Sequence, residues 1–214
     1  MLDIAIPSEL FEIGKIHILP FTRKGKYPPM AELQYISPSL SNKHINCTLM
    51  TPVLTIEEWN SFKGRLKLNC DGGSKGDSSL NSANEIFKVK IDATQEYLIS
   101  SIFALQEMLF ADSGSGSTKL THKNVDDSFK RFYDGHYLTC YISPHHLFPL
   151  YVKGNRVGLE EFHSFLKPGQ KIRLILQLNG ISKIPLEYLN SISGSNDNYS
   201  FRIQHQILGA YIVD

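Results

Sequence analysis

Regular alternation of apolar and polar residues near the C-terminus constrains the fold more than any other feature of this sequence. In Gln170–Asn179 the apolar side chains fall on every second position, at Ile172, Leu174, Leu176 and Leu178. The final segment, Phe201–Val213, is predicted to be a second long strand. Because successive side chains of a strand point to opposite faces, both segments are expected in a sheet with one buried face. The polar side chains opposite the aliphatic ones are Arg173, Gln177, Arg202, Gln204 and Gln206.

Shorter strand-like segments occupy much of the remaining chain, separated by turn-forming residues. They are Lys15–Phe21, Met30–Ser37, Ile45–Met50, an extended piece from Thr51, Gly64–Cys70, Ile86–Asp92, His136–Ser143 and Leu147–Lys153. The last two are expected to pair with each other across the turn Pro144–His146.

Two helices are predicted among these strands. Thr94–Phe110 has apolar residues at helical spacing, and Thr94 is a suitable N-cap. Gly158–Leu166 is expected to form a short helix. Flexible loops are predicted near residues 71–84, 112–124 and 190–198, where Gly, Ser, Asn and Asp are frequent.

This order of elements predicts a mainly β (α+β) protein. The favoured architecture is an antiparallel barrel of the oligonucleotide-binding (OB) type, with one long inserted helix and one short helix, because closure removes unpaired sheet edges. A β-sandwich with an embedded helix is the alternative. Residues 1–214 are expected to form a single domain, since 42% hydrophobic and 20% charged residues are typical of a globular chain.

The termini and cysteines predict an intracellular protein. The N-terminal segment lacks the basic start and apolar run of a secretory signal, and no apolar stretch is long enough to span a bilayer. Cys47, Cys70 and Cys140 are odd in number and widely spaced, as expected for reduced thiols. The net charge of +1 gives no overall attraction to nucleic acid, so such binding requires local clusters.

No pattern of catalytic or metal-binding residues is apparent. The eight histidines are scattered, and the adjacent pair His145 and His146 lacks same-face spacing. There is no nucleophile elbow and no phosphate-binding loop, although Gly72–Gly76 is glycine-rich. We therefore expect no enzyme activity, no metal and no cofactor.

Cationic and aromatic residues are interleaved in three stretches, Arg23–Tyr27, Trp59–Lys67 and Phe129–Tyr141. Proteins that bind single strands use cations along the backbone path and flat rings for base stacking, each stacked base contributing about 1–3 kcal/mol. Strand alternation places Lys88 and Lys90 on the polar side of one strand, and Tyr137 and Tyr141 on the polar side of another. One sheet face that bears all four side chains is therefore expected. The candidate DNA-binding residues are Arg23, Lys24, Lys26, Tyr27, Trp59, Arg65, Lys67, Lys88, Lys90, Lys130, Arg131, Phe132, Tyr133, Tyr137, Tyr141, Lys153 and Arg173. Trp59 and Phe132 are equally suited to a core.

Three parts of the chain carry a family resemblance. Thr48–Pro52 leads into Gly64–Cys70, Phe87–Asp92 runs into Thr94–Phe110, and Tyr137–Leu178 contains a strand, a turn, a short helix and the start of a long strand. In this order the chain resembles the OB-fold single-stranded-DNA-binding proteins of large nucleocytoplasmic DNA viruses, and more distantly those of podovirus-type phages.

The resemblance implies a non-enzymatic protein that coats exposed single strands during viral DNA replication, recombination or repair. It implies single-stranded DNA and replication proteins as partners, and the host cytoplasm or nucleus as location. Phage members often end in an acidic tail that contacts replication proteins, and Gly209–Asp214 is not of that kind. A homo-oligomer remains open. The alternative function is a protein-interaction or virion structural module, and a hydrolase or transferase has no motif in its favour.

Overall fold

The computed structural model describes residues 5–37, 43–71, 78–109, 120–142, 149–185 and 199–213. The turn Pro144–His146, the loop from 190 to 198, residues 72–77 of the predicted loop near 71–84 and residues 112–119 of the one near 112–124 lie outside the described residues. Within the described part of the chain, no helix is both long and apolar enough to cross a bilayer.

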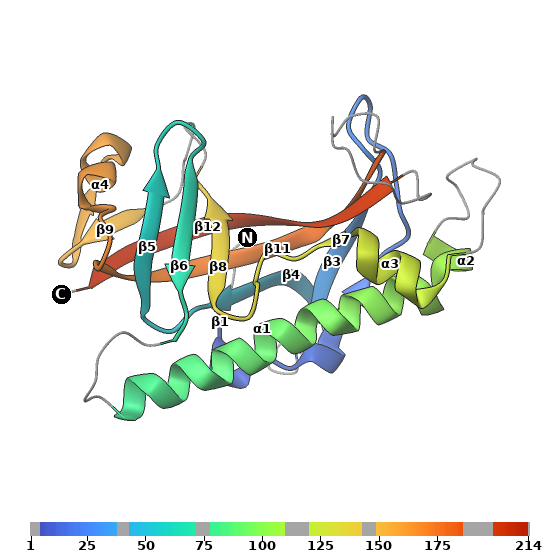
Figure 1. Cartoon of the computed structure of the whole chain (residues 1–214), viewed down its shortest axis with the longest axis horizontal. Helices are drawn as coiled ribbons and strands as arrows, with labels where there is room; N and C mark the ends of the chain where they lie inside the picture. The colour runs from blue at the N-terminus through green and yellow to red at the C-terminus, as the bar shows by residue number, and fades with distance from the viewer. Residues whose placement is uncertain are drawn as a thin grey trace.

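Two fifteen-residue strands, β11 (Lys171–Pro185) and β12 (Tyr199–Val213), pair antiparallel along their whole length. They confirm the two alternating segments and extend β11 beyond its predicted end. One edge of β11 pairs in succession with β5 (Leu54–Asn60), β4 (Lys43–Met50) and β3 (Met30–Ser37). Figure 1 shows the two strands crossing the molecule with the shorter strands arranged around them.

The sheet is mixed rather than wholly antiparallel. β12 pairs in parallel with β7 (Phe129–Lys130) at one end and with β9 (Leu150–Val152) at the other. β1 (Ile6–Pro7) is also parallel to β4, whereas β2 (Ile16–Ile18) is antiparallel to β3.

From β11 the sheet continues antiparallel through β5, β6 (Arg65–Asn69) and β8 (Tyr137–Tyr141). β8 then lies against β12. The expected pairing of Leu147–Lys153 with His136–Ser143 is wrong, because β9 pairs with β12 and with β10 (Asn155–Val157). The chain therefore curls back on itself, with β8 and β12 meeting at a seam.

The predicted strand Ile86–Asp92 is wrong. These residues lie inside one long helix, α1 (Ser78–Ala104), which also includes the end of the predicted loop near 71–84. Thr94 is not an N-cap: it is buried in the middle of α1, and its hydroxyl donates to the carbonyl of Lys90 at 2.7 Å. The apolar residues that face the core are spaced by about one helical turn, at Phe87, Ile91, Leu98, Ile99 and Ile102.

Three short helices and two 3-10 turns, Ser8–Leu10 and Ile13–Lys15, complete the described part of the chain. The helices are α2 (Gln106–Leu109), α3 (His122–Ser128) and α4 (Leu159–Phe165). α4 confirms the predicted short helix. α3 was not expected, although Thr121 forms a capping box with Asn124 at its start.

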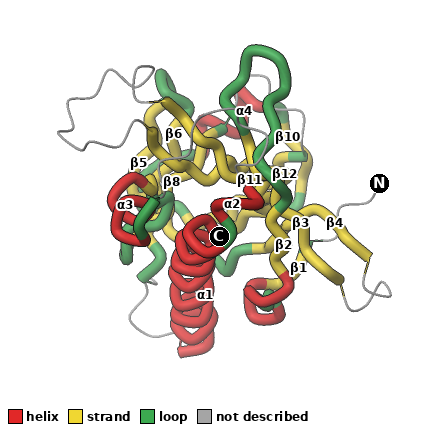
Figure 2. Tube along the Cα trace, turned by 90° about the vertical axis from the view of Figure 1, so that its right-hand side faces the viewer, coloured by secondary structure: helices red, strands yellow, loops and turns green. Residues whose placement is uncertain are grey.

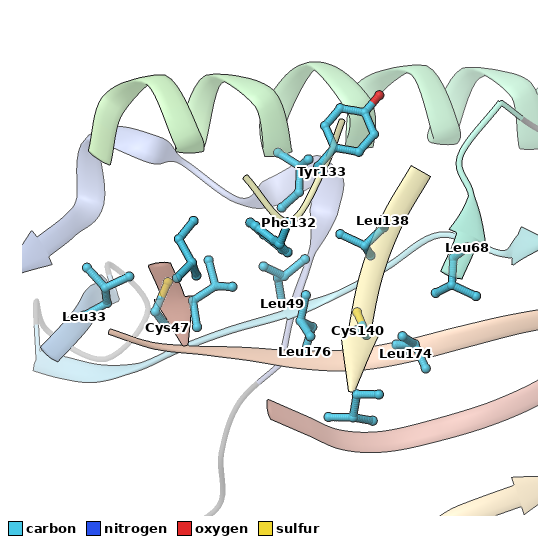
Figure 3. Close-up of a cluster of buried hydrophobic side chains, with 14 of the residues drawn as sticks. Leu33, Cys47, Leu49, Leu68, Phe132, Tyr133, Leu138, Cys140, Leu174 and Leu176 are labelled. Carbon is cyan, nitrogen blue, oxygen red and sulfur yellow. The ribbon is translucent and has the colours of Figure 1, made fainter. Parts of the chain in front are cut away.

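One continuous cluster of buried side chains joins α1, the sheet and α4. α1 lies below the strands in both views (Figures 1 and 2). The close-up shows Phe132 and Tyr133 between α1 and the strands that carry Leu49, Leu138 and Leu176 (Figure 3). The sheet therefore has one face on this core and an outer face in solvent, which is where a ligand can reach it.

Candidate nucleic-acid interface

Three aromatic rings from different segments form a series at the seam between β8 and β12. Phe132, which follows β7, stacks on His205 of β12 with ring centroids 5.3 Å apart and planes at 29°. Tyr141 of β8 lies 6.2 Å from the same imidazole. Phe132 is only 7% exposed, whereas Tyr141 is 51% exposed. The series therefore runs from the core to the surface.

A cavity of about 180 Å³ opens at this seam. Its lining residues are Lys130, Arg131, Phe132, Thr139, Tyr141, Arg202, Ile203 and His205. β12 is hydrogen-bonded to β7 at Phe201 and Arg202 and to β9 from Ala210 to Ile212. Among the described strands, none other than β11 pairs with β12 between these two positions. The cavity therefore lies where the sheet does not close by hydrogen bonds.

Two cations stand side by side at this cavity. Lys130 and Arg202 occupy partner positions on β7 and β12, and both are exposed. Neither makes an ion pair within the described residues. Arg131, the next residue, is instead held by Glu96 at 2.6 Å and Asp126 at 2.8 Å. Lys130 and Arg202 are therefore the cations of this cavity that are available for an anionic ligand.

His205 is neutral at physiological pH. The residue is partly buried, and both ring nitrogens are buried without a hydrogen bond of normal geometry to the described residues. Burial lowers the pKa of His205 to about 4, and the backbone of Ile203 offsets this only in part. Because the imidazole stays uncharged, it can lie beside three cationic side chains without repulsion.

The side chain of Gln95 on α1 positions the segment that carries Phe132. Its amide nitrogen donates to the carbonyl of Tyr133, and its oxygen accepts from the backbone N–H groups of Phe132 and Tyr133. Tyr133 is buried, its hydroxyl donates to the carbonyl of Gly135, and burial raises its pKa to about 12. Tyr133 is therefore a core residue, and the exposed tyrosine ring at the seam is Tyr141.

The outer face of β6 and β8 continues this surface. Arg65 lies opposite Tyr141 and Lys67 opposite Thr139 in the ladder. The ammonium of Lys67 is 3.8 Å from the ring centroid of Tyr137, and Arg65 pairs with Glu58 at 2.7 Å. The two cations and two tyrosines thus share one solvent-facing surface, as strand alternation predicts.

The basic loop Arg23–Tyr27 lies over another part of the outer face. Lys24 and Tyr27 line a larger cavity together with residues of β3, β4, β11 and β12. Lys24 pairs with Glu32 at 2.6 Å, and Tyr27 is 76% exposed. Arg23 and Lys26 are exposed and make no ion pair with the described residues.

The structure separates the remaining candidates from the seam. Lys88 and Lys90 lie on α1, so the prediction that they share a sheet face with Tyr137 and Tyr141 is wrong. Lys88 is paired with Asp71 and Glu85, which raises its pKa, and Lys90 donates to the carbonyls of Glu9 and Phe11.

Three more candidates lie on other parts of the sheet. Trp59 packs against the core and lies 5.0 Å from the ring of His163 on α4. Lys153 occupies the turn between β9 and β10 with φ of 51°, and Arg173 lies opposite Tyr211 near the start of β11.

Sequence reasoning missed Arg202 and His205 as site residues. Arg202 was placed on the polar side of its strand, but nothing indicated that Lys130 would be its neighbour. His205 had a usable signal: it follows Phe201 and Ile203 on the apolar side of the alternation, which is unusual for a surface histidine.

The described residues contain no group of three or more His, Cys, Asp or Glu placed to hold a metal ion. Cys47, Cys70 and Cys140 are free thiols within the core, and burial raises the pKa of each. They are packing residues rather than nucleophiles.

Comparisons with models of protein families, with curated proteins and with solved structures found no match.

Proposed function

We propose that this protein binds single-stranded DNA on the outer face of its sheet, with the β8–β12 seam as the centre of the site. The observation that carries the proposal is the pairing of two free cations, Lys130 and Arg202, with an accessible ring, Tyr141, around one cavity. A single strand presents a phosphate and a flat base in every nucleotide, and such a surface offers a partner for each.

The curvature of the sheet supports an OB-type barrel as the scaffold of this site. β11, β5, β6 and β8 form a continuous antiparallel series, and β8 returns to lie against β12. OB barrels bind oligonucleotides on an outer strand face between projecting loops. Here the turn at 61–64 and the loop at 22–29 project on the same side of the molecule (Figures 1 and 2). Phe62 and Tyr27, 95% and 76% exposed, lie in these two segments.

Salt-dependent binding of a labelled oligo-dT strand, followed by fluorescence anisotropy, tests the proposal. Replacing Lys130 and Arg202 together by alanine should weaken binding and reduce the slope of log K against log salt by about 1.4, since each single-strand phosphate contact contributes about 0.7. Duplex DNA and RNA competitors give the preference for strand type.

A matched control is available at the opposite end of β12. Arg156 of β10 and Lys167 after α4 are both exposed, so Arg156→Ala with Lys167→Ala removes the same charge. This control should leave the slope unchanged. Absence of oligo-dT binding at low salt, or equal losses in the two double variants, contradicts the proposed site.

A protein-interaction module is the second candidate, and one observation favours it. Leu10, Ile86 and Val89 are exposed to 67%, 39% and 66% on two elements in contact, Ser8–Leu10 and α1. Exposed apolar side chains gathered on contacting elements are typical of interfaces. Light scattering of the wild type and of Val89→Asp would detect self-association through this surface. If both proteins are monomers, DNA binding stays the favoured function.

A further inference from the structure

The larger cavity on the outer face is lined by an unusual number of carboxamide side chains. It has a volume of about 590 Å³, within the range of about 300–1,000 Å³ typical of sites that bind small organic groups. The amide-bearing residues around it come from four strands and are Gln34, Asn46, Gln177, Asn179 and Gln204. We name this cavity the amide groove.

Strand register explains why these amides gather. Gln34 lies opposite Asn46, and Gln204 lies opposite Gly180, the residue next to Asn179. Buried neighbours on each side of Gln34 and of Gln177 face the core, so both amides point outward. A Cβ on Gly180 would stand 2.5 Å from the carbonyl oxygen of Ala31, which means that β3 and β11 approach closely beneath the groove.

Most of these amides have unused hydrogen-bonding capacity. The side chains of Gln34, Gln177, Asn179 and Gln204 make no hydrogen bond to other described residues. Each carboxamide offers two donor hydrogens and an acceptor oxygen. A ligand in the groove can therefore meet several adjacent donors and acceptors at once.

The charge of the groove indicates a neutral ligand. Among the described residues that line it, Lys24 and Glu32 are the charged ones, and they neutralise each other in an ion pair of 2.6 Å. The exposed ring of Tyr27 stands at the rim and offers a flat surface. None of the described residues that line the groove is an unpaired cation for a phosphate, whereas a planar group with a polar edge fits both features.

The groove and the cationic seam are neighbours on the same strand. Arg202 lines the seam and Gln204 lines the groove, and they are two positions apart on the outer face of β12. Two residues along a strand span about 7 Å. A cationic subsite thus lies next to an uncharged one. This arrangement fits a polymer whose charged backbone carries neutral bases, and it does not fit a neutral sugar chain.

We propose that the amide groove receives nucleobases and recognises their hydrogen-bonding edges, so that binding depends on base identity. The proposal rests on the proposed function and deepens it, because stacking and phosphate contacts alone are tolerant of sequence. Carboxamides form a two-point contact with the N6 and N7 positions of adenine. Adenine is therefore the base expected to bind best.

Competition among oligo-dA, oligo-dC and oligo-dT of equal length at one salt concentration tests this inference. Oligo-dA should bind about 5- to 150-fold more tightly than oligo-dT, the discrimination typical of one good two-point contact. Gln204→Leu with Gln177→Leu should bring this ratio close to one. Gln206→Leu is the matched control, because Gln206 shares the outer face of β12 but does not line the groove.

A second measurement separates failure of this inference from failure of DNA binding. Adenosine, which has no phosphate, should shift the NMR signals of groove residues in the wild type and not in the double leucine variant. Equal binding of the three oligonucleotides overturns the inference and leaves the proposed function intact. Binding of a neutral oligosaccharide without adenosine also overturns it. Failure of every oligonucleotide to bind at low salt contradicts the proposed function itself.

Discussion

The side-chain oxygen of Gln95 lies 3.0 Å from the backbone nitrogen of Phe132, so the middle of α1 is hydrogen-bonded directly to the aromatic seam. The same amide also binds both backbone groups of Tyr133. Gln95 is completely buried, and water cannot replace these bonds in a variant. The position of the Phe132 ring on His205 therefore depends on a residue of the helix.

Gln95→Leu should destabilise the protein by at least about 2 kcal/mol, because three buried backbone groups lose their partner. Urea unfolding followed by far-UV circular dichroism measures the change. Gln206→Leu, on the outer face, should change stability by less than about 0.5 kcal/mol. Equal midpoints for the two variants would show that the Gln95 bonds contribute nothing.

His205 should make stability depend on pH. Its pKa of about 4 in the folded protein lies below that of an exposed histidine, so the unfolded chain takes up a proton first as the pH falls. Stability present above about pH 6.5 should decline toward pH 4, by up to about 3 kcal/mol. His205→Gln should remove this part of the decline in a series of urea titrations, and an unchanged pH profile would contradict it.

Tyr141→Ala should weaken single-strand binding by about 5- to 150-fold, equivalent to the loss of one stacked base. Tyr141→Phe keeps the ring and should retain most of the affinity. Anisotropy titrations at fixed salt measure both. A loss of the same size in Tyr141→Phe would indicate that the hydroxyl, and not stacking, is responsible.

Gly180→Ala should destabilise the sheet by about 1–3 kcal/mol, because the added methyl group would meet the carbonyl of Ala31 at 2.5 Å. Gly14→Ala is a suitable comparison, since no atom lies within 4 Å of its added methyl group. Thermal unfolding should show a lower midpoint for Gly180→Ala alone. An unchanged midpoint would mean that β3 moves away without cost.

The three thiols should be unreactive in the native protein. Burial raises the pKa of Cys47 and of Cys70 to about 12, and that of Cys140 is raised as well. Because the thiolate is the reactive form, an aromatic disulfide reagent should label none of them at neutral pH and all three in denaturant. Rapid native labelling of even one thiol would place it at the surface.

The segment Ile86–Asp92 shows why part of the fold could not be assigned from sequence. Phe87 and Ile91 are four residues apart and face the core, while Val89 between them is 66% exposed. The same three residues also satisfy the two-residue period of a strand. Such a short segment fits both patterns, and only its packing within α1 decides between them.

The candidate site could also be predicted only in part. The stretch Phe129–Tyr141 supplies Lys130, Arg131, Phe132 and Tyr141 to one cavity, and clustering in sequence was enough to indicate it. Ion pairs with Glu32, Glu58 and Glu96 were not predictable, because each joins residues that are five or more positions apart in the chain. They neutralise cations that the sequence presents as free.

The sequence by itself determined which side faces the core over Ile172–Leu178 of β11 and Phe201–Ile207 of β12, because side chains alternate between the two faces of a regular strand. Two register shifts in the β11–β12 ladder interrupt this alternation outside these stretches. The sequence therefore placed Arg202 and Gln204 outside and the aliphatic residues inside. Only the tertiary structure decided that β7 pairs with β12, so that Lys130 meets Arg202, and that β8 meets β12 without a ladder. Those relationships depend on contacts between residues distant in the chain, which no local pattern specifies.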